Sequence, residues 1–221
     1  MSAVDTIIVI AKAPEPGRCK TRLSPPCTPD QAALLAAAAL QDTLEAVAGS
    51  RARRKVVALD GAAGHWLPSG FEVVAQRGRG LDERLGAAFF DIAEPALLVG
   101  MDTPQLTAAL LNDSLATLEK TDAVLGHTVD GGFWAVGLER SFPSAFAGVP
   151  MSTAWTGAAQ QRRLEALGLR VATLPMMNDV DYISDAIDVA AQAIDSHFAA
   201  TFKALDLGME RSWYDSSTRN G

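Results

Sequence analysis

Thr6-Ile-Ile-Val-Ile-Ala-Lys12 leads directly into Ala13-Pro-Glu-Pro-Gly-Arg-Cys-Lys-Thr-Arg-Leu23. The first segment is a short run of β-branched residues, which predicts a buried central strand. The second segment cannot continue the strand, because Pro14 and Pro16 lack N–H donors and Gly17 permits a positive φ. Open α/β sheets bind ligands beyond the C-terminal ends of their strands. We therefore expect an α/β fold with a binding loop at residues 13–23.

This loop concentrates positive charge in an acidic chain. Its cations are Lys12, Arg18, Lys20 and Arg22, and its one acid is Glu15, whereas the 221-residue chain has a formal net charge of −7. Arginine offers a planar fork for two hydrogen bonds to an oxyanion, and lysine offers a mobile point charge. The loop is therefore a candidate polyphosphate site. The alternative is a basic surface loop without a ligand.

Length and composition favour one domain. With 48% hydrophobic and 20% charged residues, the sequence is expected to form a single domain over residues 1–207, followed by a disordered tail at 208–221. The longest apolar run is shorter than the roughly 18 residues of a membrane span, and no signal peptide is recognised. Two cysteines form no disulfide framework, so a cytoplasmic protein is expected. The negative charge argues against a nucleic-acid partner.

Strand and helix signals alternate along the chain. This alternation predicts a mainly parallel sheet with helices on both faces. The expected strands are 6–12, 55–59, 71–75, 96–100, 123–126, 133–138 and 170–174. The expected helices are 29–48 with Thr28 as N-cap, 82–93, 105–119, 157–167, and a long final helix from 184 to about 205.

A second stretch, Leu97-Leu-Val-Gly-Met-Asp-Thr-Pro104, places a carboxylate at the edge of the sheet that also carries the basic loop. Its strand ends at Gly100, and Asp102 follows. Mg²⁺ is typically held by one or two carboxylates together with phosphate oxygens. Asp102 is therefore a candidate metal ligand. The alternative is an N-cap of the helix expected near Pro104, where Asp is common.

Two more aspartates precede the last expected helix. Asp179 and Asp181 are two residues apart, so on extended chain their side chains point the same way. They are candidates to complete a metal site with Asp102. The alternative is that Asp181 or Ser184 caps the final helix.

Glycine-rich turns form the remaining candidates. Asp130, Gly131 and Gly132 stand between two expected strands. They are typical of a turn, and their bare backbone would let a ligand approach closely. A further turn over 76–84 contains Gly80, where a nucleobase or phosphate could pass. For Arg77 and Arg79 the favoured interpretation is a plain loop with exposed arginines.

These stretches together resemble a known family. Ala11-Lys-Ala-Pro-Glu-Pro-Gly-Arg-Cys-Lys-Thr-Arg-Leu23, Gly100-Met-Asp-Thr-Pro104, Asp130-Gly-Gly-Phe133 and Asn178-Asp-Val-Asp181 are similar to the DUF2064 proteins, which are GT-A-type members of the nucleotide-diphospho-sugar transferase superfamily. The Lys-Thr-Arg-Leu segment is more distantly similar to guanylyltransferases acting on phospholactate or molybdopterin. The resemblance covers about residues 5–190. It implies a three-layer αβα, Rossmann-like fold, a nucleotide over the C-terminal edge of the sheet, and a divalent metal on Asp102.

The chain departs from these relatives at two points. Met101 stands where they usually carry a small residue, and residues 100–102 lack the Asp-x-Asp motif that many metal-dependent sugar transferases use. The second departure favours nucleotidyl transfer over glycosyl transfer. The four cations of the basic loop point the same way, because they suit a triphosphate slightly better than a diphosphate.

The favoured prediction is a transferase that moves a nucleotidyl group from a nucleoside triphosphate to a small phosphorylated acceptor, with Mg²⁺ or Mn²⁺ as cofactor. The predicted catalytic residues are Lys20, Arg22 and Asp102. The predicted nucleotide-binding residues are Lys12, Pro16, Gly17, Arg18, Lys20, Gly80, Asp130, Gly131 and Gly132. The predicted metal ligands are Asp102, Asp179 and Asp181. Two alternatives stay open: a glycosyltransferase with a nucleotide-diphospho-sugar donor, and a nucleotide-binding protein without catalysis.

Overall fold

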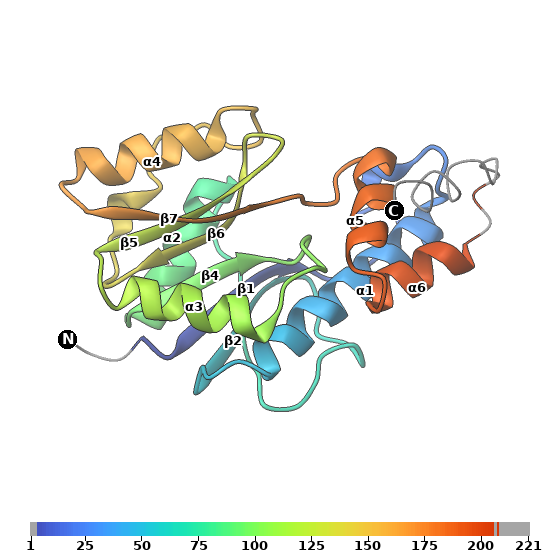
Figure 1. Cartoon of the computed structure of the whole chain (residues 1–221), viewed down its shortest axis with the longest axis horizontal. Helices are drawn as coiled ribbons and strands as arrows, with labels where there is room; N and C mark the ends of the chain where they lie inside the picture. Colours follow the sequence, from blue (N-terminus) through green and yellow to red (C-terminus); the bar gives the residue numbers. More distant parts are fainter. Residues whose placement is uncertain (1–3, 206, 208–221) are drawn as a thin grey trace, which may run out of the picture.

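A mainly parallel sheet forms the centre of the molecule (Figure 1). The computed structural model describes residues 4–205 and 207. Its strands are β1 (Thr6–Lys12), β2 (Arg54–Asp60), β3 (Glu72–Ala75), β4 (Ala96–Gly100), β5 (Ala123–Thr128), β6 (Phe133–Leu138) and β7 (Val171–Met177). Within these residues the sheet order is β3-β2-β1-β4-β6-β5-β7. Each pairing is parallel except those of β6, which runs antiparallel to β4 and β5.

Strand β1 occupies the centre of the sheet, as its β-branched run predicts. It pairs with β2 on one side and with β4 on the other. Ile7, Ile8 and Val9 are fully buried, because helices cover both faces at this point. A strand enclosed in this way leaves only its ends open to a ligand.

Helices form the two outer layers. They are α1 (Pro29–Ala48), α2 (Leu81–Ile92), α3 (Ala108–Leu118), α4 (Thr156–Ala166), α5 (Ile183–Gln192) and α6 (His197–Ala204), with short 3₁₀ turns η1 (Thr21–Leu23) and η2 (Pro143–Ala145). Apolar side chains of α1 and α3 pack on one face of the sheet, and those of α2 and α4 on the other. The predicted three-layer αβα arrangement is thus confirmed. None of the described helices is both long and apolar enough to cross a bilayer.

Helix α1 begins where the sequence predicts. The Thr28 hydroxyl accepts from the backbone N–H of Gln31 at 3.2 Å, and the Gln31 side chain accepts from the N–H of Thr28 at 2.8 Å. Such a capping box satisfies two N–H groups that the first helical turn leaves without partners.

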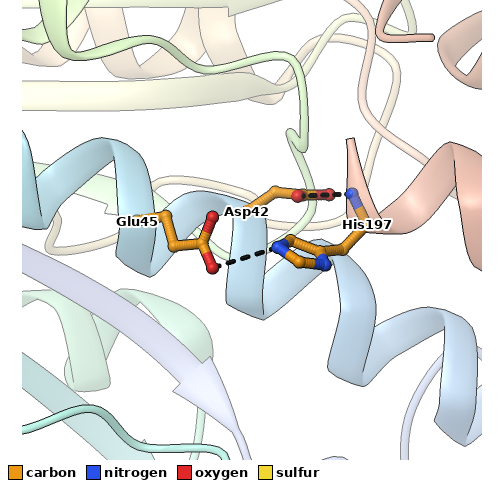
Figure 2. Close-up of side chains that lie close together, drawn as sticks. All are labelled: Asp42, Glu45 and His197. Carbon is orange, nitrogen blue, oxygen red and sulfur yellow. Dashed lines mark hydrogen bonds and ion pairs between the residues drawn. The ribbon is translucent and has the colours of Figure 1, made fainter. Parts of the chain in front are cut away.

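The predicted single helix from 184 to 205 is wrong, because the chain forms α5 and α6 with a break between them. Two side chains bind the N–H groups at the start of α6. The Ser196 hydroxyl accepts from the N–H of Ala199 at 3.0 Å. The Asp42 carboxylate on α1 accepts from the N–H of His197 at 2.8 Å (Figure 2). It also accepts from the N–H of Phe198 at 2.8 Å. The tail predicted at 208–221 lies outside the described residues.

Asp42 therefore caps the N-terminus of α6 from α1, a helix that is distant in sequence but adjacent in space. Its side chain is buried, and burial raises the pKa of the carboxyl, against the opposing effect of the two N–H donors. The His197 ring lies 3.0 Å from the Glu45 carboxylate on the same helix α1 (Figure 2). Helices α5 and α6 pack beside α1 through an apolar cluster that includes Phe198 and Phe202.

We expect Asp42→Ala to lower the free energy of unfolding by about 1–3 kcal/mol, because it leaves the buried N–H of Phe198 and the partly buried N–H of His197 without their acceptor. Urea denaturation followed by circular dichroism measures the change. Asp188→Ala is the matched control, because Asp188 is exposed on α5. Equal stability of the Asp42→Ala and Asp188→Ala variants would contradict this role of Asp42.

Candidate functional site

A cavity of about 790 Å³ opens at the edge of the sheet where β1 and β4 end and β6 begins. Parallel strands bring their C-terminal residues to one edge, so loops that are distant in sequence meet there. The cavity is lined by residues that follow β1, β3, β4 and β7 and by the β5–β6 turn. It is bounded further by the start of α2 and by the segment before α4.

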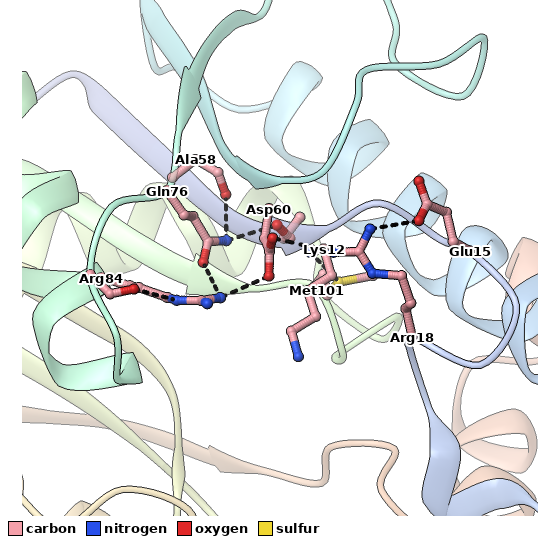
Figure 3. A network of polar contacts seen from close by, with 10 residues as sticks. Lys12, Glu15, Arg18, Ala58, Asp60, Gln76, Arg84 and Met101 are labelled. Carbon is pink, nitrogen blue, oxygen red and sulfur yellow. Dashed lines mark hydrogen bonds and ion pairs between the residues drawn. The ribbon is translucent and has the colours of Figure 1, made fainter.

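A polar network holds the β1–β3 side of the cavity (Figure 3). Gln76 donates through Nε2 to the carbonyl oxygens of Ala11 and Ala58, at 2.8 and 2.9 Å. Arg84 on α2 donates through Nη1 to Asp60 Oδ2 at 2.8 Å, and this nitrogen lies 3.4 Å from Gln76 Oε1. The ends of β1 and β2 and the start of α2 are thereby connected through side chains.

Two cations of the basic loop face this side. Arg18 pairs with Glu15 at 2.7 Å and lies 3.6 Å from Asp60 Oδ1. Lys12 ends β1 and lines the cavity with an exposed side chain; in the described part of the chain it forms no salt bridge. Its ammonium group extends away from the network in Figure 3. Lys12 is therefore available to an anion in the cavity, whereas Arg18 already contacts two carboxylates.

Lys20 connects the basic loop to the acidic side of the cavity. Its backbone has a left-handed conformation, with φ at 49°, and only 7% of its side chain is exposed. Nζ lies 2.8 Å from Asp102 Oδ1 and 3.9 Å from Asp181 Oδ1, and it donates to the Val180 carbonyl. A buried ammonium requires such partners, because its desolvation is costly. A non-glycine residue in this conformation often marks a functional site.

Arg22 and Asp102 complete this group of charges. Arg22 Nη1 pairs with Asp181 Oδ2, and its guanidinium lies over the Tyr182 ring, 5.7 Å from the ring centre. Asp102 does not cap a helix, because α3 begins at Ala108 and its N-cap is Thr107. That alternative interpretation of Asp102 is wrong, and its carboxylate faces Lys20 instead.

Three carboxylates come together beside Lys20. One oxygen from each of Asp130, Asp179 and Asp181 lies within 4.8 Å of the others. Burial, followed by the negative charges of Asp130 and Asp181, raises the pKa of Asp179 to about 7. Asp181 and Ser184 do not cap α5, since the Asp185 carboxylate accepts from the N–H of Tyr182 at 2.7 Å.

The Asp130-Gly-Gly segment forms the predicted turn. Asp130 Oδ1 accepts from the N–H of Gly132 at 2.9 Å, which orients the carboxylate. Gly131 has φ at 92°, and a Cβ there would lie 1.9 Å from the carbonyl oxygen of Ala154. The N–H of Gly157 donates to the Gly131 carbonyl at 2.8 Å. Only glycine fits at this position, and the turn is fixed against the segment that precedes α4.

The structure gathers most of the residues predicted from the sequence. Those that line the cavity are Lys12, Arg18, Lys20, Arg22, Asp102, Asp130, Gly132, Asp179 and Asp181. Those that do not line it are Pro16, Gly17, Gly80 and Gly131. The predicted metal group paired Asp179 and Asp181 with Asp102, whereas the compact acidic group contains Asp130 and the Asp102 carboxylate contacts Lys20.

Several cavity residues were missed in the sequence. Arg79 lines the cavity with an exposed side chain, although the sequence favoured a plain surface loop for it, and Arg84, to which no role was assigned, also lines the cavity. Arg77, two positions before Arg79, instead pairs with Asp91. Asp60 does not line the cavity but pairs with Arg84, and a signal for it was available, because it directly follows a predicted strand.

Comparison with known proteins supports this description of the fold. A family model described as "Uncharacterized protein conserved in bacteria (DUF2064)" matches residues 33–153. No curated protein matches the chain. The structure is similar to a proposed nucleotide-diphospho-sugar transferase from Desulfovibrio desulfuricans G20, with 28% identity, a TM-score of 0.81, and coverage of 92% of this chain and 95% of the other.

Two more distant structures share the fold. Rv0371c from Mycobacterium tuberculosis H37Rv, solved in complex with manganese, is 20% identical with a TM-score of 0.55, over 85% of this chain and 98% of the other. CMP:2-keto-3-deoxy-manno-octonic acid synthetase, solved with CTP, is 13% identical with a TM-score of 0.52. The match covers 86% of this chain and 97% of the other. The predicted nucleotide-diphospho-sugar transferase fold is confirmed.

We expect Asp179→Asn to stabilise the metal-free protein at pH 8. The folded protein holds the Asp179 proton up to about pH 7, whereas the unfolded chain loses it near pH 4. The folded state therefore binds more protons between these values, and stability falls as the pH rises through this window. The substitution should remove a penalty on the order of 1–4 kcal/mol at pH 8.

Thermal unfolding in the presence of a chelator, at pH 5 and pH 8, measures this difference. The gain in melting temperature should be present at pH 8 and should shrink at pH 5. Asp188→Asn is the control for loss of one charge. A gain of the same size at both pH values would rule out the raised pKa as its cause.

Proposed function

The chain belongs to the DUF2064 family, and we propose that it is a metal-dependent nucleotidyltransferase. In this proposal it binds a nucleoside triphosphate at the C-terminal edge of the sheet and transfers the nucleotidyl group to a small acceptor. Its structural neighbours include transferases and nucleotidyltransferases.

The observation that carries the proposal is the separation of charge along one cavity. Lys12, Arg18, Arg79 and Arg84 lie on the β1–β3 side, and Asp102, Asp130, Asp179 and Asp181 lie toward β4, β6 and β7. A nucleoside triphosphate with a divalent cation has the complementary pattern, because its phosphates need cations and its metal needs carboxylate oxygens.

Lys20 and Arg22 stand at the boundary between these two sides. We assign them, with Arg18, to the phosphates of the donor. Lys20 and Arg22 are near carboxylates that would also contact the metal, and Arg18 lines the same cavity. Negative charge builds up on the leaving pyrophosphate during transfer, and a cation fixed in advance stabilises it. The confined, left-handed Lys20 is suited to this role because its position is set by the fold.

The acidic group fits a hard divalent cation. Its three carboxylates converge within 4.8 Å. The pKa of Asp179 is raised by burial and then by the negative charges of Asp130 and Asp181, which a cation would balance. Asp130, Asp179 and Asp181 are the proposed ligands. Asp102, predicted from the sequence as a ligand, becomes a further one when Lys20 contacts phosphate. Mg²⁺ or Mn²⁺ would supply Lewis-acid stabilisation of the phosphates.

The proposed reaction is a displacement at the α-phosphorus. An oxygen of the acceptor forms the new P–O bond, and pyrophosphate leaves with the electron pair of the bond that breaks. Such catalysis depends mainly on positioning and electrostatic stabilisation. The residues of this chain hold the donor and keep its leaving group facing Lys20 and Arg22.

A second candidate function is glycosyl transfer from a nucleotide-diphospho-sugar. It is favoured by the name of the Desulfovibrio protein, which is 28% identical to this chain. The same cavity would hold the donor, and the leaving group would be a nucleoside diphosphate. Release of pyrophosphate from a triphosphate separates the two reactions, because only nucleotidyl transfer produces it.

We expect a nucleoside triphosphate to raise the melting temperature in a Mn²⁺-dependent way, since a ligand that binds only the folded state stabilises it. Lys12→Met should weaken binding about 10-fold or more, because it removes a charged contact to phosphate. Lys55→Met is the matched control, since Lys55 lies near the N-terminal end of β2, at the opposite edge of the sheet. No stabilisation by any triphosphate or nucleotide sugar would contradict the proposal.

We expect pyrophosphate release to require a divalent metal and to fall on the order of 10²–10³-fold in Lys20→Ala. Asp181→Asn should raise the Mn²⁺ concentration needed for half-maximal rate. The Mn²⁺ concentration for half-maximal rate, measured for Asp102→Asn, tests the prediction that Asp102 is a metal ligand. Metal-dependent binding with no turnover of any donor would favour a nucleotide-binding protein without catalysis.

A further inference from the structure

Thr128 is a buried polar residue directly behind the acidic side of the cavity. It ends β5, it is 3% exposed, and it does not line the cavity itself. Its hydroxyl donates to Asp130 Oδ1, and this is the one hydrogen bond of that hydroxyl within the described residues. Asp130 is exposed and lines the cavity. A buried donor therefore holds an exposed carboxylate, and such a bond is stronger than one surrounded by water.

The strands on both sides of Thr128 are irregular. In the β5–β7 pairing, Gly126 lies opposite Leu174 but Thr128 lies opposite Met177, so β7 has one residue more than β5 over this interval. The register between β5 and β6 also shifts after Gly126. Bulges of this kind redirect side chains and are common beside active sites. We attribute the orientation of the Thr128 hydroxyl toward Asp130 to this change of register.

The backbone of Thr128 is bonded within the β5–β6 turn. Its N–H donates to the Gly132 carbonyl at 3.2 Å, and its carbonyl accepts from the N–H of Gly131 at 3.1 Å. A Cβ at Gly132 would lie 2.8 Å from Thr128 Oγ1 and 3.2 Å from Asp130 Oδ1. The absence of a side chain at Gly132 thus gives the hydroxyl and the carboxylate the space to meet.

The two oxygens of Asp130 differ in their contacts. Oδ1 accepts from the Thr128 hydroxyl and from the N–H of Gly132. Oδ2 makes no hydrogen bond or ion pair with any residue that the structure describes. A carboxylate oxygen has lone pairs for a cation or a donor. Oδ2 is therefore the oxygen of Asp130 that is available to a cation.

The same turn is bonded to the segment that carries the other two carboxylates. The N–H of Val129 donates to the Met177 carbonyl at 3.0 Å. Asp179 follows Met177 by two residues, and Asp181 by four. The position of Asp130 relative to Asp179 and Asp181 is thus set by the contacts of residues 128 and 129.

We propose that Thr128 is a positioning residue for the divalent cation: its hydroxyl holds Asp130 beside Asp179 and Asp181 and leaves Oδ2 to the cation. This inference rests on the proposed function, which includes the metal site. Groups that hydrogen-bond to a metal ligand orient it, and their loss typically weakens metal affinity about 10–100-fold. A purely structural Thr128 would instead stabilise the turn without affecting the cation.

The test is binding of Mn²⁺ alone to the full-length protein at pH 8, followed by the electron paramagnetic resonance signal of free Mn²⁺. Thr128→Val keeps the shape of the side chain but removes the hydroxyl, and we expect its Kd for Mn²⁺ to rise about 10-fold or more. Thr128→Ser keeps the hydroxyl and should remain within about 3-fold of the wild type. An unchanged Kd in Thr128→Val, or equal losses in the valine and serine variants, would overturn the inference.

Thr43→Val is the matched control. Thr43 is also buried, and its hydroxyl donates to the Ala39 carbonyl at 3.0 Å within α1, outside the cavity. This variant loses a buried hydrogen bond but should keep the wild-type affinity for Mn²⁺. If Thr128→Val does not fold, Thr128→Cys decides, because a thiol is a weak donor. Weaker Mn²⁺ binding by Thr128→Cys supports the inference, and wild-type binding overturns it.

Asp130→Asn tests whether the effect passes through Asp130. It should weaken Mn²⁺ binding at least as much as Thr128→Val, because an amide oxygen lacks the charge of a carboxylate. Wild-type affinity in Asp130→Asn would overturn the inference, while a site built from the other aspartates would stand. If the wild-type protein binds no Mn²⁺, the proposed metal site fails, and the role of Thr128 fails with it.

Discussion

The contact between the Lys20 ammonium and the Asp102 carboxylate, 2.8 Å long, joins the two halves of this site. It connects the loop after β1 to the loop after β4, which are adjacent strands in the sheet. Because the ammonium is almost completely buried, it needs its carboxylate and carbonyl partners in the folded state. The position of the basic loop therefore depends on the acidic side of the cavity, and the two sides form together.

The parallel sheet explains why so many charges lie in one place. The loops after β1, β2, β3 and β4 emerge at the same edge. Strand β6 runs in the opposite direction, so its N-terminal end lies at that edge, and the Asp130 turn that precedes it lies there too. The resulting cavity has cations on one side and carboxylates on the other. Mutual repulsion within each group is balanced by contacts such as Arg84 with Asp60, and by the ligands that we propose.

Local signals in the sequence were sufficient for most of the fold. The β-branched run at 6–12, the Thr28 cap and the alternation of strands and helices all agree with the structure. The single helix predicted at 184–205 failed for a physical reason. Its break is stabilised by Asp42, whose carboxylate caps α6 from a position 155 residues earlier than His197. Helical pattern within the segment carries no information about such an acceptor.

The sequence by itself determined that this protein has a central buried strand, a cationic loop that follows it, and aspartates beside strand ends, because these depend on residues that are neighbours in the chain. The tertiary structure alone decided which charges meet. It placed Asp130 with Asp179 and Asp181, turned Asp102 toward Lys20, and set Arg84 against Asp60 and Gln76. These contacts join segments far apart in sequence, and their geometry follows from strand order and helix packing.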